Sequence, residues 1–310
     1  MNVSQFDLDD RVPFEQIPGG LHVRAFGVDY ARLADNHGGQ LYLTKHGWPW
    51  RKSLDSSVWF ADGRYHREGQ RLRGGTGTVY RLELSRPSEP RVELVAKVSR
   101  FAEHVPIFMP STLPPNLPPN LVDEAVFNSP FEEFGLIEDM RRSRFGPPEL
   151  RILTKRPLAI YCSPRRYKLW QLGRTEGRFH GYDVALQADQ EDVDEKDRVS
   201  LNIDRQYIML FGWVRGVTAE ELAISGELSQ EEVKALSARV NQELYQKGFR
   251  ILDNKPKHFI LRRRPDGRLV RRNGKLSYVQ IDFELLQRTE AYRRYITRYD
   301  PSIVLHEESR

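Results

Sequence analysis

Apolar and polar positions alternate along two neighbouring segments of the chain. The first runs from Gly77 to Leu84 and the second from Val92 to Val98, and Arg86-Pro87-Ser88-Glu89-Pro90 separates them. Alternation with a period of two is typical of strands, and a Pro- and Ser-containing segment between them favours a turn. The pattern therefore predicts an antiparallel strand pair. Shorter apolar runs predict further strands at residues 40–44, 158–161 and 207–211.

A helical period follows elsewhere in the chain. Phe131, Phe134, Ile137 and Met140 recur at helical spacing after Asn128-Ser129-Pro130, which favours a helix beginning there. Capping-box spacing, Thr218 to Glu221 and Ser229 to Glu232, predicts the start of two more helices. The second of these carries Val233, Leu236, Val240 and Leu244 on one face and should end at Gly248. A last helix is expected at about residues 289–299, and the mixture of elements predicts an α+β protein.

Two stretches lack such periodicity. Residues 106–119 contain six prolines, so they should form an extended connection rather than a helix or a central strand. Residues 189–197 contain six acids against Lys196, which favours a solvated loop. The aromatic-rich residues 1–70 are expected to form a packed N-terminal extension.

Composition narrows the class of protein. The 310 residues include 48 Lys and Arg against 43 Asp and Glu, and a net charge of +5 does not by itself indicate nucleic-acid binding. The single cysteine, Cys162, excludes an internal disulfide framework and a thiolate zinc site. No apolar run approaches the roughly 20 residues that span a bilayer. We therefore expect a cytoplasmic protein without a transmembrane segment.

Candidate chemistry begins with a glycine-rich turn. Gly74, Gly75 and Gly77 lie between two predicted strands, and glycines allow backbone N–H groups to approach phosphate oxygens closely. Lys97 ends the apolar run Val95-Ala96-Lys97, where a cation needs an anion or a route to water. Taken alone, a hairpin with three glycines is more often structural. The lysine is equally compatible with a strand lysine that reaches solvent.

A second group of candidates lies near the C-terminus. Asp253 follows a helix and a short apolar segment, Lys255 comes two residues later, and His258 precedes an apolar strand. The basic hairpin, which we define as residues 262–275, then leads to Asp282 after another predicted strand.

The order of these segments resembles the protein-kinase-like fold, across about residues 71–290. In that resemblance Gly74 and Gly77 are the second and third glycines of the phosphate-covering loop, Lys97 ends a Val-Ala-Ile-Lys type strand, and Phe211–Gly216 is the segment behind adenine. Asp253 corresponds to the catalytic base, Lys255 to the lysine after it, and Asp282 to the Asp of Asp-Phe-Gly. It implies a two-lobed protein with an N-lobe at 71–210, containing insertions, and a reduced C-lobe at 211–310.

The resemblance also implies the site residues. Asp253 and Lys255 are the catalytic candidates, and His258 and Asp282 are the metal candidates for Mg²⁺ or Mn²⁺. The candidates for binding ATP are Gly74, Gly75, Gly77, Val79, Val95, Lys97, Glu133, Phe211, Val214 and Ile260. Glu133 is chosen from four glutamates (124, 132, 133 and 138) because Ile137 lies one helical turn later.

The chain departs from the family pattern at several positions. Leu72 replaces the first glycine, Ile251-Leu252 replaces the His-Arg before the catalytic Asp, and Glu284 replaces the last glycine of Asp-Phe-Gly. His258 stands where the family has a metal-binding Asn, as in small bacterial kinases of the lipopolysaccharide (sugar) kinase type. Only 28 residues follow Asp282, which leaves little room for a platform that docks protein substrates.

These features predict an ATP-dependent phosphotransferase, an atypical kinase that acts on a hydroxyl of a small molecule, glycan or protein. The alternative is a pseudokinase, a nucleotide-binding or interaction module without phosphoryl transfer, which the departures favour. The basic hairpin suggests an anionic acceptor, or a third function in binding RNA or a membrane surface. Nucleic acid is the less favoured partner, because no aromatic residue lies between Arg262 and Lys275.

Overall fold

The computed structural model describes residues 11–72, 77–85, 90–105, 125–178 and 201–299. The predicted turn at 86–90, the proline-rich connection and the acidic loop lie wholly or mainly outside these residues. The chain divides into two compact units. The first unit contains Met1–Glu103, Ser129–Gly135 and Arg156–Trp213, and the second contains His104–Asn128, Leu136–Lys155 and Val214–Arg310.

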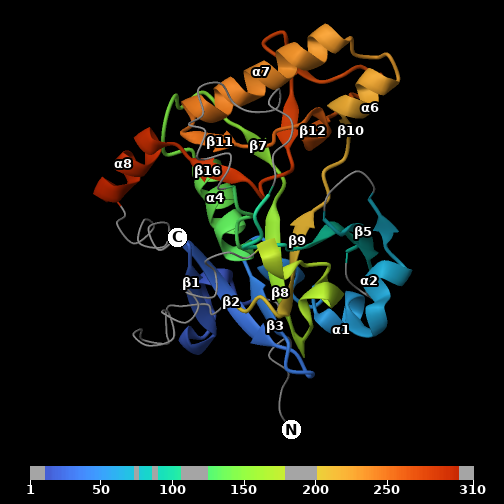
Figure 1. The fold of residues 1–310 in the computed structure, drawn as a ribbon, viewed down its shortest axis with the longest axis vertical. Coiled ribbons are helices and arrows are strands. Elements are labelled where there is room, and N and C mark those ends of the chain that lie inside the picture. The colour runs from blue at the N-terminus through green and yellow to red at the C-terminus, as the bar shows by residue number, and fades with distance from the viewer. Residues whose placement is uncertain (1–10, 73–76, 86–89, 106–124, 179–200, 300–310) are drawn as a thin grey trace. The chain divides into compact units, whose positions relative to one another are not determined.

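A large antiparallel sheet forms the centre of the first unit (Figure 1). Within the described residues its strand order is β1-β2-β3-β8-β9-β6-β5-β4. The strands are β1 (His22–Ala25), β2 (Val28–Ala34), β3 (Gln40–Leu43), β4 (Gln70–Arg71), β5 (Val79–Leu84), β6 (Val92–Val98), β8 (Pro157–Arg166) and β9 (Arg205–Gly212). The helices α1 (Ser56–Trp59) and α2 (Arg64–Arg67) belong to the same unit. The predicted pair 77–84 and 92–98 is confirmed as β5 and β6.

The N-terminal residues continue this sheet. Sequence patterns predicted one strand there, at residues 40–44, whereas the structure also contains the hairpin β1–β2. Phe26 and Gly27 form its turn with φ angles of 48° and 72°. Positive φ at both central residues is the geometry that matches strand twist, and Asn-Gly or Asp-Gly usually signals it. Phe-Gly lacks that signal, so the hairpin was missed.

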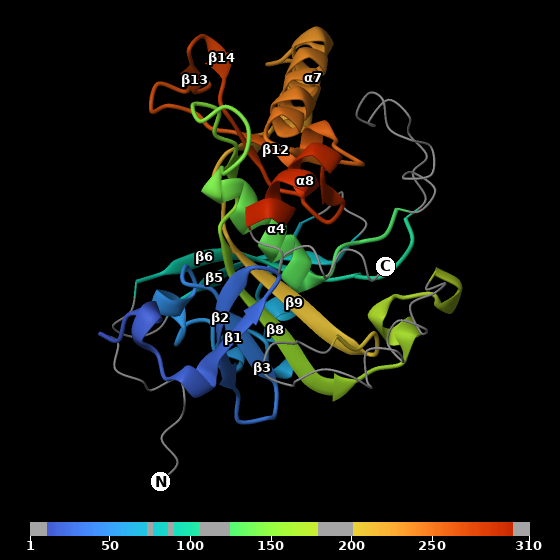
Figure 2. The ribbon, with the colours of Figure 1, turned by 90° about the vertical axis from the view of Figure 1, so that its left-hand side faces the viewer.

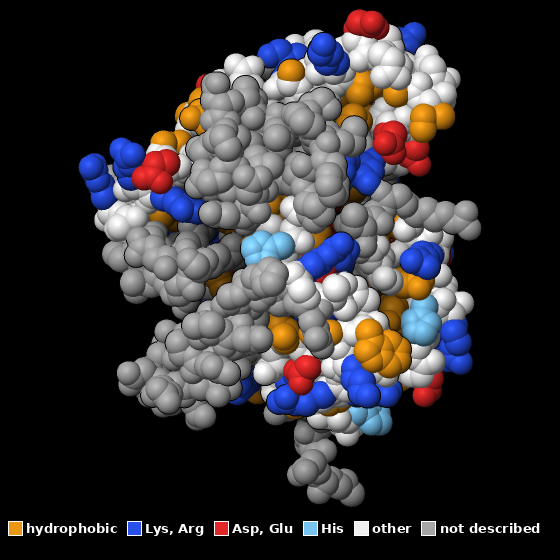
Figure 3. All heavy atoms as spheres, viewed as in Figure 1, with side chains coloured by type: hydrophobic (Ala, Val, Ile, Leu, Met, Phe, Trp, Pro, Cys, Tyr) orange, Lys and Arg blue, Asp and Glu red, His pale blue; other side chains and the backbone are white. Residues whose placement is uncertain are grey.

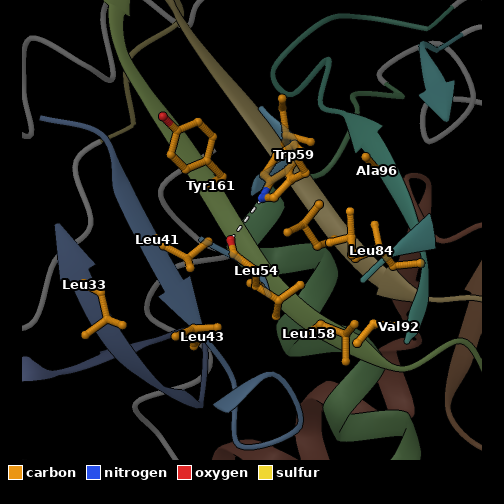
Figure 4. Close-up of a cluster of buried hydrophobic side chains, with 14 of the residues drawn as sticks. Leu33, Leu41, Leu43, Leu54, Trp59, Leu84, Val92, Ala96, Leu158 and Tyr161 are labelled. Carbon is orange, nitrogen blue, oxygen red and sulfur yellow. Dashed lines mark hydrogen bonds between the residues drawn. The ribbon is translucent and has the colours of Figure 1, made fainter. Parts of the chain in front are cut away.

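One face of the sheet packs into a hydrophobic core (Figure 4). Leu94 and Ala96 of β6 point into it, together with Leu158 and Tyr161 of β8. Trp59 of α1 lies in the same core, and its indole N–H donates to the Leu54 carbonyl at 3.0 Å. A buried indole N–H needs such an acceptor, and this one comes from the chain just before the helix.

Helix α4 (Pro130–Arg142) confirms the predicted helix after Ser129. Its residues up to Gly135 belong to the first unit and its later residues to the second. Phe131 packs edge-on against Tyr30 and Tyr42, with ring centroids 5.4 and 5.0 Å apart. Phe134 contacts Phe211 of β9 in the same unit, with centroids at 5.1 Å. These aromatic contacts position the first turns of the helix.

The second unit combines small sheets with helices (Figure 2). Its strands pair as β10-β12-β15-β7, β11-β16 and β13-β14, and β15–β7 is a parallel pair. The strands are β7 (Leu153–Thr154), β10 (Val217–Thr218), β11 (Phe249–Ile251), β12 (Phe259–Leu261), β13 (Arg271–Arg272), β14 (Lys275–Leu276), β15 (Tyr278–Gln280) and β16 (Leu286–Arg288). The helices that lie wholly within it are α6 (Ala219–Ile224), α7 (Gln230–Gln246) and α8 (Glu290–Tyr299).

Both predicted capping boxes are confirmed. Thr218 accepts a hydrogen bond from the Glu221 N–H at the start of α6, and Ser229 accepts one from the Glu232 N–H at the start of α7. The predicted apolar face of α7 is buried, as the helical period required: Val233, Leu236, Val240 and Leu244.

The overall class is thus a mixed α+β protein with a large antiparallel sheet and several helices. Among the helices in the described ranges, none has the length and apolar character needed to cross a membrane. On the face drawn in Figure 3, basic and acidic side chains are interspersed over α7 and over α8.

Gly248 connects α7 to β11 in a conformation that few other residues adopt. Its φ is 80°, and a Cβ at this position would lie 2.6 Å from the Tyr292 Cβ and 2.8 Å from the Phe145 ring. Gly226, which follows α6 with φ 75°, has no heavy atom within 4 Å of such a Cβ. Both helix ends therefore need a residue with positive φ, but only Gly248 is also closely packed.

We expect Gly248→Ala to lower the free energy of unfolding by about 2–4 kcal/mol, since backbone strain and overpacking add. Gly226→Ala is the matched control and should cost only about 1 kcal/mol, from backbone strain alone. Urea unfolding followed by circular dichroism measures both. Equal losses in the two variants would contradict the close packing of Gly248.

Candidate functional site

Lys97 of the first unit lies on the sheet face opposite the hydrophobic core. In β6, Leu94 and Ala96 point into the core, so Val95 and Lys97 point to the other face. Cross-strand pairing places Val79 of β5 opposite Lys97 and Phe211 of β9 opposite Val95. The face thus gathers four of the predicted nucleotide-binding residues, and Val79 and Val95 are half-buried.

An ion pair joins this face to α4. The Lys97 ammonium lies 3.7 Å from a Glu133 carboxylate oxygen, and the side chains are 9% and 1% exposed. Burial of either charge alone would be costly, so the two charges stabilise each other. The pairing that the resemblance implied is therefore present. Its role in holding phosphates stays a prediction.

The other helix glutamates have different contacts. Glu132 accepts a hydrogen bond from the Ser129 N–H at 3.2 Å and completes a capping box. In the second unit Glu138 lies 3.5 Å from the Arg141 guanidinium. All three glutamates of α4 are buried, contrary to the simple expectation of solvated helix charges. Glu133 forms the ion pair with Lys97 described above.

The glycine-rich turn is described only in part. Gly74 and Gly75 lie outside the described residues, and Gly77 immediately precedes the start of β5. The Leu72 N–H donates to the Val79 carbonyl at 2.9 Å, so the chain returns to β5 after the turn. Phosphate binding by these glycines stays a prediction.

A loop and strand pair in the second unit gather the predicted catalytic and metal residues. β12 pairs with β15 so that Phe259 lies opposite Gln280, and the Ile281 N–H donates to the His258 carbonyl at 3.1 Å. This register brings His258 beside Asp282. The His258 Nε2 and an Asp282 carboxylate oxygen are 3.3 Å apart.

Asp253 and Lys255 contact each other in the same loop. The Lys255 ammonium donates to the Asp253 carboxylate at 2.6 Å, and the two side chains are 24% and 29% exposed for Asp253 and Lys255. Partial exposure leaves both groups accessible from solvent. The pair places a base and a cation together, which suits transfer of a negatively charged group to a hydroxyl.

The hydrogen bond at Nδ1 favours one tautomer of the His258 ring. The Lys255 backbone N–H donates to Nδ1 at 3.3 Å, so Nδ1 is the acceptor atom of the ring. A neutral imidazole then carries its proton on Nε2, which faces the Asp282 carboxylate. In this state the Nε2–H lies beside the Asp282 carboxylate, 3.3 Å from one of its oxygens. Metal ligation by Nε2 would require the proton to move.

Two amide side chains extend this network, and sequence reasoning did not identify them. The Gln280 amide donates to the Asn254 side-chain oxygen at 3.1 Å and to the Asp282 carbonyl at 3.2 Å. Asn254 in turn donates to Asn241 of α7 at 2.8 Å. Gln280 is fully buried and Asn254 is 2% exposed. A polar residue inside the apolar run Tyr278–Ile281 was the available signal.

The segment after Asp282 has its own anchor in this unit. The Asn128 side-chain amide donates to the carbonyls of Phe283 and Leu286 at 3.1 and 2.8 Å. Its backbone N–H donates to the Glu284 carbonyl at 2.9 Å. The sequence analysis treated Asn128 only as part of a helix start, whereas its hydrogen bonds fix the chain that follows the predicted metal ligand.

The donor set permits a divalent ion without enclosing it. A carboxylate oxygen of Asp282 is a ligand that Mg²⁺ prefers, whereas imidazole suits Mn²⁺ better than Mg²⁺. Within the described ranges, no group of three or more His, Cys, Asp and Glu side chains could hold a metal. Mg²⁺ bound through one or two carboxylates is usually completed by phosphate oxygens and water, and this site fits that pattern.

The remaining nucleotide candidates occupy defined positions. Phe211 is buried in β9 of the first unit, Val214 is the residue where the second unit resumes, and Ile260 is the central residue of β12. Ile260 pairs with Thr218 on one side and Val279 on the other. Contact of these residues with adenine stays a prediction.

Comparison with known proteins adds no family. No protein-family model matches the sequence, and no curated protein matches it significantly.

We expect Lys97→Met to lower the free energy of unfolding by about 3–5 kcal/mol, because it leaves a buried carboxylate without its cation. Lys97→Met combined with Glu133→Gln should lose less than the sum of the two single variants. Urea unfolding of all four proteins gives the coupling energy, which should exceed about 1 kcal/mol. Additive losses would show that the two side chains do not interact.

Proposed function

We propose that this protein is an ATP-dependent phosphotransferase, an atypical kinase that transfers the γ-phosphoryl group to a hydroxyl of a small molecule, glycan or protein. The observation that carries the proposal is the arrangement in the second unit. Asp253 pairs with Lys255 at 2.6 Å, and Asp282 lies 3.3 Å from His258 after the adjacent strand. A base, a cation and a metal-binding carboxylate are the groups that such a reaction uses.

The strand pairings support the kinase-like fold as part of this proposal. β11, before the loop, pairs with β16, which follows Asp282, and β12 pairs with β15. Both pairs are antiparallel and enclose the two acidic positions in the order that the resemblance requires. The buried Lys97–Glu133 ion pair of the first unit is a second, independent support. The proposed lobe boundaries at residues 70 and 210 remain predictions.

The proposed chemistry assigns one task to each side chain. Asp253 would accept the proton of the acceptor hydroxyl while the oxygen of that hydroxyl forms a bond to the γ-phosphorus. The bond from that phosphorus to the bridging oxygen of ATP breaks, and ADP leaves with the electron pair. Lys255 would stabilise the charge on the transferred group, and Lys97 would bind the α- and β-phosphates. Asp282 would hold Mg²⁺ or Mn²⁺, which would neutralise part of the phosphate charge.

The alternative is a pseudokinase, and one observation favours it. With Nδ1 accepting from the Lys255 N–H, His258 presents a protonated Nε2 to Asp282. A nitrogen that carries a proton has no lone pair for a metal. This state therefore favours a site in which His258 orients Asp282 and metal binding is weak. Nucleotide binding without turnover would be its experimental sign.

We expect Asp253→Asn to reduce ATP turnover by on the order of 10²–10⁴-fold, because the base is lost. ATP affinity should change little, since Asp253 would contact the acceptor. Asp282→Asn should reduce ATP turnover and should also weaken metal-dependent ATP binding. The assays are ADP release and isothermal titration calorimetry with Mg²⁺.

Asp266→Asn is the matched control, because it removes an exposed carboxylate of the same unit and should leave both quantities unchanged. If the wild type binds ATP without turnover, the pseudokinase is supported. If it neither binds nor hydrolyses ATP, the whole proposal fails.

The ligand role of His258 has a direct spectroscopic test. With Mn²⁺ and ATP bound, electron spin echo spectroscopy detects an imidazole nitrogen coordinated to the ion. If His258 ligates, this nitrogen signal should be present in the wild type and absent in His258→Gln. If His258 only donates to Asp282, the wild type should show no such signal, and His258→Gln should keep Mn²⁺ affinity within about threefold because an amide N–H can replace the donor.

A further inference from the structure

The basic hairpin borders a hollow on the surface of the second unit. The hollow has a volume of about 460 Å³ and lies between the hairpin and the start of α7. Figure 2 shows the hairpin strands β13 and β14 near α7. Four arginines line it: Arg263, Arg264, Arg268 and Arg271. Two glutamates, Glu227 and Glu232, line it as well.

Both glutamates already have partners within the unit. Glu227 accepts two hydrogen bonds from the Arg263 guanidinium, at 2.8 and 2.6 Å, and these lower the pKa of its carboxyl group. Glu232 accepts from the Ser229 N–H at 2.9 Å, in the capping box of α7. Glu227 therefore neutralises Arg263, and Glu232 caps the start of α7. Among the described residues, neither carboxylate forms an ion pair with the other three arginines of the hollow.

Three cations remain. In the described part of the chain, no carboxylate forms an ion pair with Arg264, Arg268 or Arg271. The Arg271 guanidinium donates to the Gly274 carbonyl at 3.1 Å, and that contact leaves its charge uncompensated. Like charges held close together repel each other, so a bound anion would stabilise this arrangement. A cluster of uncompensated arginines is suited to phosphate, which guanidinium groups bind with paired hydrogen bonds.

The hairpin backbone holds Arg264 and Arg268 in a defined turn, and Arg271 lies in β13. The Arg264 N–H donates to the Arg268 carbonyl at 2.8 Å, and the Gly267 N–H donates to the Arg264 carbonyl at 2.9 Å. The Arg263 side chain donates to the Gly267 carbonyl at 3.0 Å, from the same guanidinium that pairs with Glu227. An ordered turn reduces the entropy lost when a ligand binds.

We propose that this hollow is a binding site for a compact anion that carries two or more phosphate groups, with Arg264, Arg268 and Arg271 as its contacts. The volume of the hollow is within the range of small-ligand sites and suits a small ligand rather than a polymer. The site is independent of the proposed phosphoryl transfer, because it uses none of the residues assigned to ATP, metal or acceptor proton.

The test is isothermal titration calorimetry of the full chain with inorganic pyrophosphate, without nucleotide or metal. The combined variant Arg264→Ser, Arg268→Ser and Arg271→Ser should raise the Kd at least ~10-fold, since charge-assisted hydrogen bonds are lost. The matched control is Arg262→Ser, Arg272→Ser and Lys275→Ser. These residues are exposed in the same hairpin, carry the same total charge and do not line the hollow. The control should change the Kd by less than ~3-fold, because exposed charges at a distance are screened.

Glu227→Gln provides a change in the opposite direction. It frees the Arg263 guanidinium while removing a negative charge from the hollow, so pyrophosphate binding should tighten. Circular dichroism shows that each variant is folded. Weaker or unchanged binding by Glu227→Gln would overturn the proposal, as would equal losses in the two triple variants.

Two further comparisons identify the source of the phosphate groups. If the natural ligand is a free phosphorylated molecule, the protein should bind pyrophosphate and should not bind vesicles of phosphatidylcholine with one-fifth phosphatidic acid. If the ligand is a lipid headgroup, the protein should bind these vesicles, and the Arg264, Arg268 and Arg271 variant should not. If Lys97→Met abolishes pyrophosphate binding and the arginine variant does not, the ligand occupies the proposed nucleotide site and this proposal is wrong.

Discussion

The register of β12 against β15 is the constraint on which the candidate site of the second unit depends. Phe259 lies opposite Gln280, and so His258 and Asp282, which lie just outside the paired residues, come within 3.3 Å of each other. A shift by one residue would turn alternate side chains to the opposite face of the sheet. Both faces of this strand pair are buried, so such a shift would break the packing of Phe259, Leu261 and Val279. The packing of apolar residues in β12 and β15 therefore sets the positions of His258 and Asp282, which lie next to these strands.

In the first unit, apolar packing likewise sets the position of Lys97. Alternation along β6 sends Leu94 and Ala96 into the core and Lys97 to the other face. Burial there is tolerated because Glu133, on the first turns of α4, lies 3.7 Å away. The helix is in turn positioned by Phe131 and Phe134, which pack on rings of the sheet. In both units the polar candidates are thus placed by the packing of their apolar neighbours.

Periodicity was sufficient to predict the elements that carry these residues, and long-range contacts explain what it missed. The strands β5 and β6, the helix α4 and both capping boxes follow local rules, so the sequence predicted them. The β1–β2 hairpin was missed because Phe26-Gly27 is not a typical turn pair. Asn254 and Gln280 were missed for another reason. Their hydrogen bonds join residues 26 positions apart, and no local pattern indicates that two amides will meet in a buried site.

In each unit the candidate lysine already has an anionic partner. Lys97 has Glu133, and Lys255 has Asp253, so each cation has an anion before any phosphate is present. A phosphate would exchange one anionic partner for another, which costs less than desolvating a lone cation. The carboxylate of Asp282 faces an imidazole instead, since the His258 Nε2 lies 3.3 Å from it. A protonated Nε2 favours the proposed pseudokinase and a metal ion at Asp282 favours the proposed kinase, so the metal dependence of Asp282 distinguishes the two proposals.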